Sequence, residues 1–284
     1  MENKNLKIGI IGLGLIGGSF ALALKQKLNA EIYGKDKYFL DKAKDLGLID
    51  FELDDNNLQE MKFVIIATPV DTIGKIAIEL LDKISDKTLV FDTGSIKHNI
   101  AQVIENHSKR NQFLLAHPIA GTEYSGPDAA FASLYKNKIN IICDTDRTRK
   151  DLLKRALEIF RKLNMQIIEM QSKEHDRHIA YVSHLSHISS FMLGKTVMDL
   201  EKDEKNIFQM AGSGFASTVR LAKSSPETWT PIFTENQVNI LQALDEYIEN
   251  LENFKKLLQN NKSRNIKELL TRTNHIKNII DKIG

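Results

Sequence analysis

The stretch Lys7-Ile8-Gly9-Ile10-Ile11-Gly12-Leu13-Gly14-Leu15-Ile16-Gly17-Gly18-Ser19 decides the fold of this 284-residue chain. A short β-branched run enters a glycine cluster, which leads directly into the helix-like segment 20–24. This order is typical of a dinucleotide-binding motif: Gly12 allows a sharp turn, Gly14 allows a pyrophosphate to approach the backbone, and Gly17 allows the helix to pack on the strand. The residues predicted to bind the dinucleotide here are Gly12, Gly14, Leu15, Ile16 and Gly17.

Asp36 adds a second element of this motif. It ends the β-run 31–35 and lies nineteen positions beyond Gly17. A carboxylate at about this offset binds the adenosine ribose. Because a carboxylate repels the 2′-phosphate of NADP, the sequence favours NAD as the cofactor, although the neighbouring Lys35 and Lys37 could instead attract that phosphate.

The composition places the chain among ordinary soluble globular proteins, with 42% hydrophobic and 27% charged residues. A net charge of +2 gives no reason to expect a nucleic acid or a membrane as a partner. The single cysteine, Cys143, excludes an internal disulfide framework and fits a reducing compartment. Five glycines interrupt the apolar run 8–24, and no cleavage site follows it, so we expect a cytoplasmic protein.

Strand and helix patterns alternate in the first part of the chain, which predicts an α/β fold with a doubly wound, Rossmann-type parallel sheet. After the first two strands, the expected strands are 63–67, 89–91, 113–116, 139–143 and 165–170, and the expected helices are 38–48, 72–83, 96–106 and 149–163. From Ser172 onward only helical periodicity remains, over 172–198, 206–222, 226–258 and 263–283. We therefore predict a dinucleotide-binding domain at 1–170 and an all-helical substrate and dimerisation domain at 171–284.

An apolar stripe runs along the predicted helix 226–258. It consists of Ile240, Leu244, Tyr247, Ile248, Leu251, Phe254 and Leu258. So long a stripe must pack against other helices. The pattern fits a homodimer formed through the helical domain and a helical bundle within one chain equally well.

Polar side chains follow the carboxyl ends of three predicted strands. Ligands of doubly wound sheets bind in the crevice outside these ends. The residues expected there are Thr68, Pro69, Thr93, Ser95 and His117. We expect Thr68, Pro69 and Thr93 to contact the cofactor.

The segment His117-Pro118-Ile119-Ala120-Gly121-Thr122-Glu123 carries a family resemblance together with three other stretches, which are residues 12–19, 183–187, and 212–215 before Arg220. In these features the chain resembles the prephenate/arogenate dehydrogenases of tyrosine biosynthesis, over roughly residues 7–229. The resemblance implies an NAD-dependent oxidative decarboxylation of prephenate to 4-hydroxyphenylpyruvate. An arogenate or dual cyclohexadienyl dehydrogenase is the alternative.

The reaction that this resemblance implies needs a base near the ring hydroxyl. His117 is the candidate, because a neutral imidazole can accept the hydroxyl proton at physiological pH. Ser95 resembles the family serine that hydrogen-bonds the same hydroxyl, although it could instead cap the helix 96–106. Arg220 matches the residue that binds the side-chain carboxylate, and its other interpretation is an ordinary surface arginine.

Further contacts follow from the same resemblance. His184 and His187 could bind the substrate or the nicotinamide region, and tyrosine could act as an inhibitor in the pocket near His187. Thr122 and Glu123 could touch the substrate or gate its entrance. The segment 216–219 before Arg220 is uncharged where many members of the family carry charges, which leaves Glu123 without a predicted ionic partner.

Three other interpretations compete with this assignment. The pairs His175/His178 and His184/His187 could bind a metal, but helical zinc pairs usually follow a different spacing and the chemistry needs no Lewis acid, so no metal is predicted. A β-hydroxyacid dehydrogenase would use a lysine of the helical part, for which Lys195 is the nearest candidate. A dimer that senses NAD without turnover is the non-enzymatic alternative.

Overall fold

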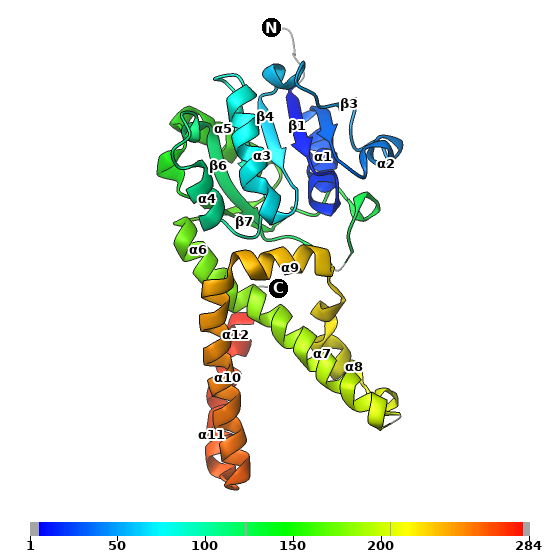
Figure 1. Cartoon of the computed structure of the whole chain (residues 1–284), viewed down its shortest axis with the longest axis vertical. Coiled ribbons are helices and arrows are strands. Elements are labelled where there is room, and N and C mark those ends of the chain that lie inside the picture. Colours follow the sequence, from blue (N-terminus) through cyan, green and yellow to red (C-terminus); the bar gives the residue numbers. More distant parts are fainter. Residues whose placement is uncertain (1–5, 123, 205, 281–284) are drawn as a thin grey trace. The chain divides into compact units, whose positions relative to one another are not determined.

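The computed structural model describes residues 6–122, 124–204 and 206–280. The chain divides into two compact units, Met1–Gln237 and Val238–Gly284. The first unit contains an eight-stranded sheet in the order β3-β2-β1-β4-β5-β6-β7-β8 (Figure 1). Its strands are β1 (Lys7–Ile11), β2 (Glu31–Lys35), β3 (Phe51–Glu52), β4 (Phe63–Ile66), β5 (Leu89–Asp92), β6 (Phe113–Pro118), β7 (Ile139–Cys143) and β8 (Gln166–Met170).

Helices cover both faces of this sheet. On one face, side chains of α1 (Leu15–Leu28), α2 (Leu40–Asp45) and α5 (Lys150–Lys162) join the hydrophobic core. On the other face, α3 (Val70–Lys83) and α4 (His98–Ile104) form a second core. Every residue of β4, β5 and β6 is buried, as expected for central strands of a doubly covered parallel sheet. The predicted Rossmann-type architecture is thereby confirmed.

The sheet departs from the prediction at its last two strands. The first six strands are mutually parallel, whereas β7 runs antiparallel to β6 and β8 runs parallel to β7. The described residues of the connection 119–138 contain only a short 3₁₀ turn, Pro127–Ala129, and otherwise form loops and turns, whereas an α-helix usually joins parallel neighbours. The two-residue strand β3 was not predicted, because so short a run carries no readable alternation.

The helical part of the first unit is more broken than its periodicity suggests. Its helices are α6 (Ser172–Ile179), α7 (Leu185–Asp203), α8 (Ser213–Thr218) and α9 (Pro226–Glu235). The helix predicted over 172–198 is interrupted by a π-helix, Ala180–His184, and the helix predicted over 206–222 reduces to α8 between two 3₁₀ turns. The helix predicted over 226–258 breaks at Asn236, whose buried amide donates to the Asp176 carbonyl at 2.8 Å.

The described residues of the second unit form helices joined by short turns. It contains most of α10 (Gln237–Gln259), together with α11 (Ser263–Thr273) and α12 (Lys277–Ile280). A 3₁₀ turn, Asn274–Ile276, interrupts the helix predicted over 263–283, and residues 281–283 of that prediction lie outside the described chain. Three residues of the apolar stripe, Ile248, Leu251 and Leu258, are 44–55% exposed. Within the described residues, no helix combines the length and the hydropathy needed to cross a lipid bilayer.

Candidate active site

The glycine loop between β1 and α1 depends on glycine for its own shape. Gly12 has a φ of +93°, and a Cβ at this position would lie 2.4 Å from the Ala67 carbonyl oxygen. A Cβ at Gly17 would lie 1.8 Å from the Gly12 carbonyl oxygen. A Cβ at Gly14, by contrast, would have no atom within 4 Å. The backbone at Gly14 therefore borders open space at the N-terminus of α1, where the unpaired amides of a helix attract a phosphate.

The Asp36 carboxylate lies against this loop. It accepts hydrogen bonds from the backbone amides of Leu13 at 2.7 Å, Tyr38 at 2.8 Å and Phe39 at 2.9 Å. A carboxylate has about four acceptor positions, so a fourth donor such as a ribose hydroxyl can still be accommodated. The glycine loop, the start of α1 and Asp36 together fit the pyrophosphate and ribose of a dinucleotide.

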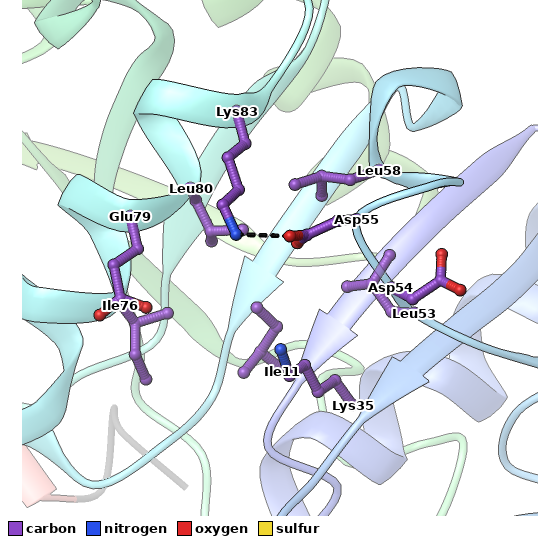
Figure 2. Close-up of a pocket in the computed structure, with 10 residues that line it drawn as sticks. All are labelled: Ile11, Lys35, Leu53, Asp54, Asp55, Leu58, Ile76, Glu79, Leu80 and Lys83. Atoms are coloured by element: carbon purple, nitrogen blue, oxygen red, sulfur yellow. Dashed lines mark hydrogen bonds and ion pairs between the residues drawn. The ribbon is translucent and has the colours of Figure 1, made fainter.

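A pocket opens beside the carboxyl ends of β1 and β2 (Figure 2). Lys35, the residue before Asp36, lies at its edge, and an ion pair of 2.7 Å joins Asp55 to Lys83 of α3. The rest of the lining is apolar apart from two acidic side chains; it comprises Ile11, Leu53, Asp54, Leu58, Ile76, Glu79 and Leu80. An apolar slot with a polar edge, next to the Asp36 carboxylate, suits a planar base.

The other candidates at the strand ends lie where the topology places them. Thr68 and Pro69 follow β4, and the Thr68 hydroxyl accepts a hydrogen bond of 2.8 Å from Thr72. Thr93 follows β5 and donates its backbone N–H to the Ile66 carbonyl at 3.0 Å. These three candidates therefore line the carboxyl edge of neighbouring strands.

Ser95 does not cap the helix that follows it. The helix α4 begins at His98, two residues later than this alternative requires, and its N-cap residue is Lys97. Among the described residues, the Ser95 hydroxyl has no hydrogen-bond partner, and its side chain is half-buried. The hydroxyl thus stays available to a ligand.

His117 lies near the end of β6 and is only 8% exposed. Its Nδ1 lies 2.9 Å from His175 Nε2, and its Nε2 has no hydrogen-bond partner in the described part of the chain. Burial lowers the pKa of His117 well below its ordinary value of 6.5, and the nearby His175, Lys97 and His184 lower it further. The imidazole is therefore neutral at physiological pH, as a proton acceptor must be.

A carboxylate hydrogen-bonds the second histidine of the pair His117 and His175. Asp176 of α6 accepts from His175 Nδ1 at 2.7 Å and from the backbone amides of Lys97 and His98 at 2.8 Å each. The Lys97 ammonium in turn pairs with Asp92, with both side chains fully buried, and donates to the Ala116 carbonyl at 2.8 Å. These contacts join α6 to the loop after β5, and Lys97 joins this loop to β6, the strand that carries His117.

Sequence reasoning missed this arrangement. In the sequence, His175 stands out only as one of a pair of possible metal ligands, and no pattern marks Asp176. His175 and Asp176 lie 58 and 59 residues beyond His117 along the chain, and no local pattern encodes their contact with it. Within the described residues, no group of three or more potential ligands is arranged to hold a metal ion.

The π-helix and the helices after it bring several further candidates together. His184, at the last position of the π-helix, is fully buried, and its Nδ1 lies 3.2 Å from the Asn236 amide nitrogen. His184 Nε2 has no partner among the described residues. The Trp229 ring meets the His184 ring edge-on at 5.9 Å and stacks on the His187 ring at 3.3 Å. Burial lowers the pKa of His187, and the charge of Arg220 lowers it further. Arg220 begins the 3₁₀ turn Arg220–Lys223, which packs against α7, the helix that carries His187.

The remaining candidates are less closely tied to it. Thr122 is exposed, and its hydroxyl accepts from the Tyr124 amide at 3.2 Å. Glu123 lies outside the described residues. Lys195, the residue that a β-hydroxyacid dehydrogenase would need, is exposed on α7 and pairs with Asp199. An exposed, ion-paired lysine is not an activated base.

Comparison with known proteins identifies both halves of the chain. Residues 20–169 match the family model of the prephenate dehydrogenase nucleotide-binding domain, and residues 171–272 match that of the prephenate dehydrogenase dimerization domain. Cyclohexadienyl dehydrogenase of Zymomonas mobilis is 30% identical over 87% of this chain and 87% of its own. Prephenate dehydrogenase of Bacillus subtilis is 31% identical over 94% of this chain and 74% of its own.

A solved structure matches almost the whole chain. It is the crystal structure of prephenate dehydrogenase from Aquifex aeolicus in complex with hydroxyphenyl propionate and NAD⁺. This protein is 31% identical to the chain, with a TM-score of 0.90, and the match covers 99% of this chain and 100% of that one. The likeness thus extends through the sheet and the helical part alike.

Proposed function

Because the chain belongs to the prephenate dehydrogenase family, we propose that it converts prephenate to 4-hydroxyphenylpyruvate by NAD-dependent oxidative decarboxylation in tyrosine biosynthesis. The observation that carries this proposal is His117: a neutral imidazole near the end of β6, with Nδ1 hydrogen-bonded inside the protein and Nε2 unpaired. Such a group can accept the proton of a ring hydroxyl.

The residues of this chain divide the work as follows. Nε2 of His117 takes the proton from the ring hydroxyl, and Ser95 hydrogen-bonds the same oxygen. When bound, NAD accepts the hydride from the carbon that carries this hydroxyl. The ring carboxylate leaves as carbon dioxide, and its bonding electrons complete the aromatic ring and restore the negative charge on the ring oxygen, which takes the proton back from His117. Burial of His117 keeps it neutral, and therefore ready to act as a base, before each turnover.

Substrate binding falls to the cluster around Trp229. We assign Arg220 to the side-chain carboxylate of prephenate, because a guanidinium binds a carboxylate through two parallel hydrogen bonds. The unpaired, buried Nε2 of His184 supports a role for this histidine in holding a polar group of the substrate. His187, Thr122 and Glu123 complete the proposed set.

The proposed cofactor is NAD, held by the glycine loop, Asp36, Thr68, Pro69 and Thr93. The open space at Gly14 suits the pyrophosphate, and the pocket of Figure 2 suits the adenine. The fixed negative charge of Asp36 disfavours the 2′-phosphate of NADP. The Aquifex aeolicus relative was crystallised with NAD⁺, which supports the same choice.

Arogenate is the alternative substrate, because the Zymomonas mobilis relative is named a cyclohexadienyl dehydrogenase. Arogenate carries an amine where prephenate carries a keto group, and the uncharged segment 216–219 before Arg220 offers no carboxylate to pair with an amine. Prephenate is therefore the preferred substrate in our proposal, with arogenate as the second.

The proposed division of the chain remains 1–170 for the nucleotide and 171–284 for substrate binding and dimerisation. We propose a homodimer formed through the helical part. The match to a dimerization domain and the exposed apolar residues of α10 support it. Tyrosine, which shares its phenol ring with the product, is a proposed inhibitor that binds near His187, in place of the substrate.

Initial rates of NADH or NADPH formation, measured for prephenate and arogenate with each cofactor, test these assignments together. Prephenate with NAD should give the highest kcat/KM. His117→Asn should lower kcat with little change in KM, whereas Arg220→Ala should raise the KM for prephenate. If the protein binds NAD but turns over neither substrate, the proposed dehydrogenase activity is refuted and the NAD-sensing dimer remains as the alternative.

A further inference from the structure

We propose that His175 and Asp176 are positioning residues that fix the tautomer of His117, so that its proton-accepting nitrogen is the one that faces the substrate. This inference rests on the proposed function, because it assigns the two residues to the same base. It concerns a chain of three side chains: the Asp176 carboxylate, the His175 ring and the His117 ring.

The first step is the orientation of Asp176. Its Oδ1 accepts a hydrogen bond from the Lys97 amide and its Oδ2 one from the His98 amide, both at 2.8 Å, so two successive backbone amides bind the carboxylate. Asp176 is 2% exposed, and each of these amides can only donate. The carboxylate is therefore held in one orientation, with both of its oxygens accepting hydrogen bonds.

The second step passes this constraint to His175. Its Nδ1 lies 2.7 Å from Asp176 Oδ1. A carboxylate cannot donate, so the proton of this hydrogen bond belongs to His175 Nδ1. In a neutral imidazole the other nitrogen then carries a lone pair, which makes His175 Nε2 an acceptor.

The third step fixes His117. Its Nδ1 lies 2.9 Å from His175 Nε2, and the two rings meet edge-on with an interplanar angle of 69°. Because His175 Nε2 accepts, His117 Nδ1 must donate, which leaves the lone pair of His117 on Nε2. This is the nitrogen without a partner in the described chain, and the one from which the proposed base must act.

The same chain stabilises the product of proton transfer. When Nε2 of His117 takes a proton, the ring becomes positively charged while its Nδ1 still donates to His175. The negative charge of Asp176 lies one ring further along. The other groups that influence His117 are Lys97, from the loop after β5, and His184, from the π-helix, and both disfavour the positive charge.

Nitrogen NMR of the histidine rings tests the tautomer directly in the wild-type protein, before any substrate is added. We expect a proton on Nδ1 of both His117 and His175 and none on either Nε2. A proton on Nε2 of His117 would overturn the inference. This readout does not depend on activity, so it remains decisive even if prephenate is not turned over and the proposed function fails.

Two substitutions at position 175 test the consequence for catalysis. His175→Leu removes the acceptor for His117 Nδ1 and should lower kcat by about 10²- to 10⁴-fold, the range that general base catalysis contributes, with KM for prephenate unchanged. His175→Gln supplies a side-chain carbonyl that can accept the same hydrogen bond, so its kcat should exceed that of His175→Leu by at least about tenfold.

The matched control is His107, a second histidine paired with an aspartate. Its Nε2 lies 3.1 Å from Asp82, and it follows α4 outside the chain of contacts to His117. His107→Gln should leave kcat and the His117 tautomer unchanged. Equal kcat values for His175→Gln and His175→Leu would show that His175 acts only through packing and would overturn the proposal.

Discussion

Gly14 and Gly17 should separate nucleotide binding from stability, although they are three residues apart in one loop. An alanine Cβ at position 14 would meet no atom within 4 Å, and Gly14 has extended backbone with a φ of −74°, which alanine adopts readily. Gly14→Ala should therefore leave the free energy of unfolding unchanged or raise it by about 0.4–1 kcal/mol, through the lower entropy of the unfolded chain.

The same methyl group should obstruct NAD. It would fill space at the N-terminus of α1 that the proposed pyrophosphate needs. Forcing an extra methyl group into a packed contact costs about 1–3 kcal/mol. At 1.4 kcal/mol for each factor of ten, the Kd for NAD should rise by about 5- to 140-fold.

Gly17→Ala should behave in the opposite way. A Cβ at position 17 would lie 1.8 Å from the Gly12 carbonyl oxygen, so α1 must shift away from β1 even in the absence of a ligand. We expect the free energy of unfolding to fall by about 1–3 kcal/mol or more. Urea unfolding and calorimetric titration with NAD measure both quantities for both variants. Tight NAD binding by Gly14→Ala, or equal loss of stability in the two variants, would refute this interpretation of the loop.

Three further predictions concern single charges. Because burial keeps the pKa of His117 below 6.5, kcat/KM should stay constant as the pH falls through 6.5 and decline only at lower pH, where His117 becomes protonated; a midpoint at or above 6.5 would contradict this. Asp36→Asn should narrow the preference for NAD over NADP by at least about tenfold in kcat/KM, since it removes the charge that repels the 2′-phosphate, and an unchanged ratio would exclude that role. Lys97→Met should lower the free energy of unfolding by about 3–5 kcal/mol in urea titrations, because it leaves Asp92 buried without its partner; a loss below about 1 kcal/mol would contradict it.

The sheet was predictable because its signals are local. Glycines at fixed spacing after a β-branched run, and buried strands that alternate with helices, report the fold within windows of about 30 residues. The reversal of β7 was not predictable, because an antiparallel strand buried on a covered sheet has the same apolar pattern as a parallel one.

The helical part was harder to predict because its breaks depend on tertiary contacts. The π-helix leaves the apolar periodicity of 172–198 almost intact in the sequence, yet it marks the buried position of His184. The break at Asn236 is likewise held by a side-chain contact with Asp176, 60 residues earlier. A local pattern cannot report either feature.

The residues of the candidate site also differ in whether a local pattern or a tertiary contact places them. Residues at strand ends, such as His117 and Ser95, could be singled out from motif and topology. Asp176 and Trp229 could not be singled out, because the packing of α6 and α9, and no local motif, brings them to the histidines of the site. His175 was visible in the sequence, but its pairing with His117 became apparent only in three dimensions.

The stoichiometry of the reaction tests the central claim most directly. With prephenate and NAD, the purified protein should release one carbon dioxide and one 4-hydroxyphenylpyruvate for each NADH formed, because hydride removal and loss of the ring carboxylate belong to one aromatisation. NADH formed without carbon dioxide, or no NADH at all, would contradict the account.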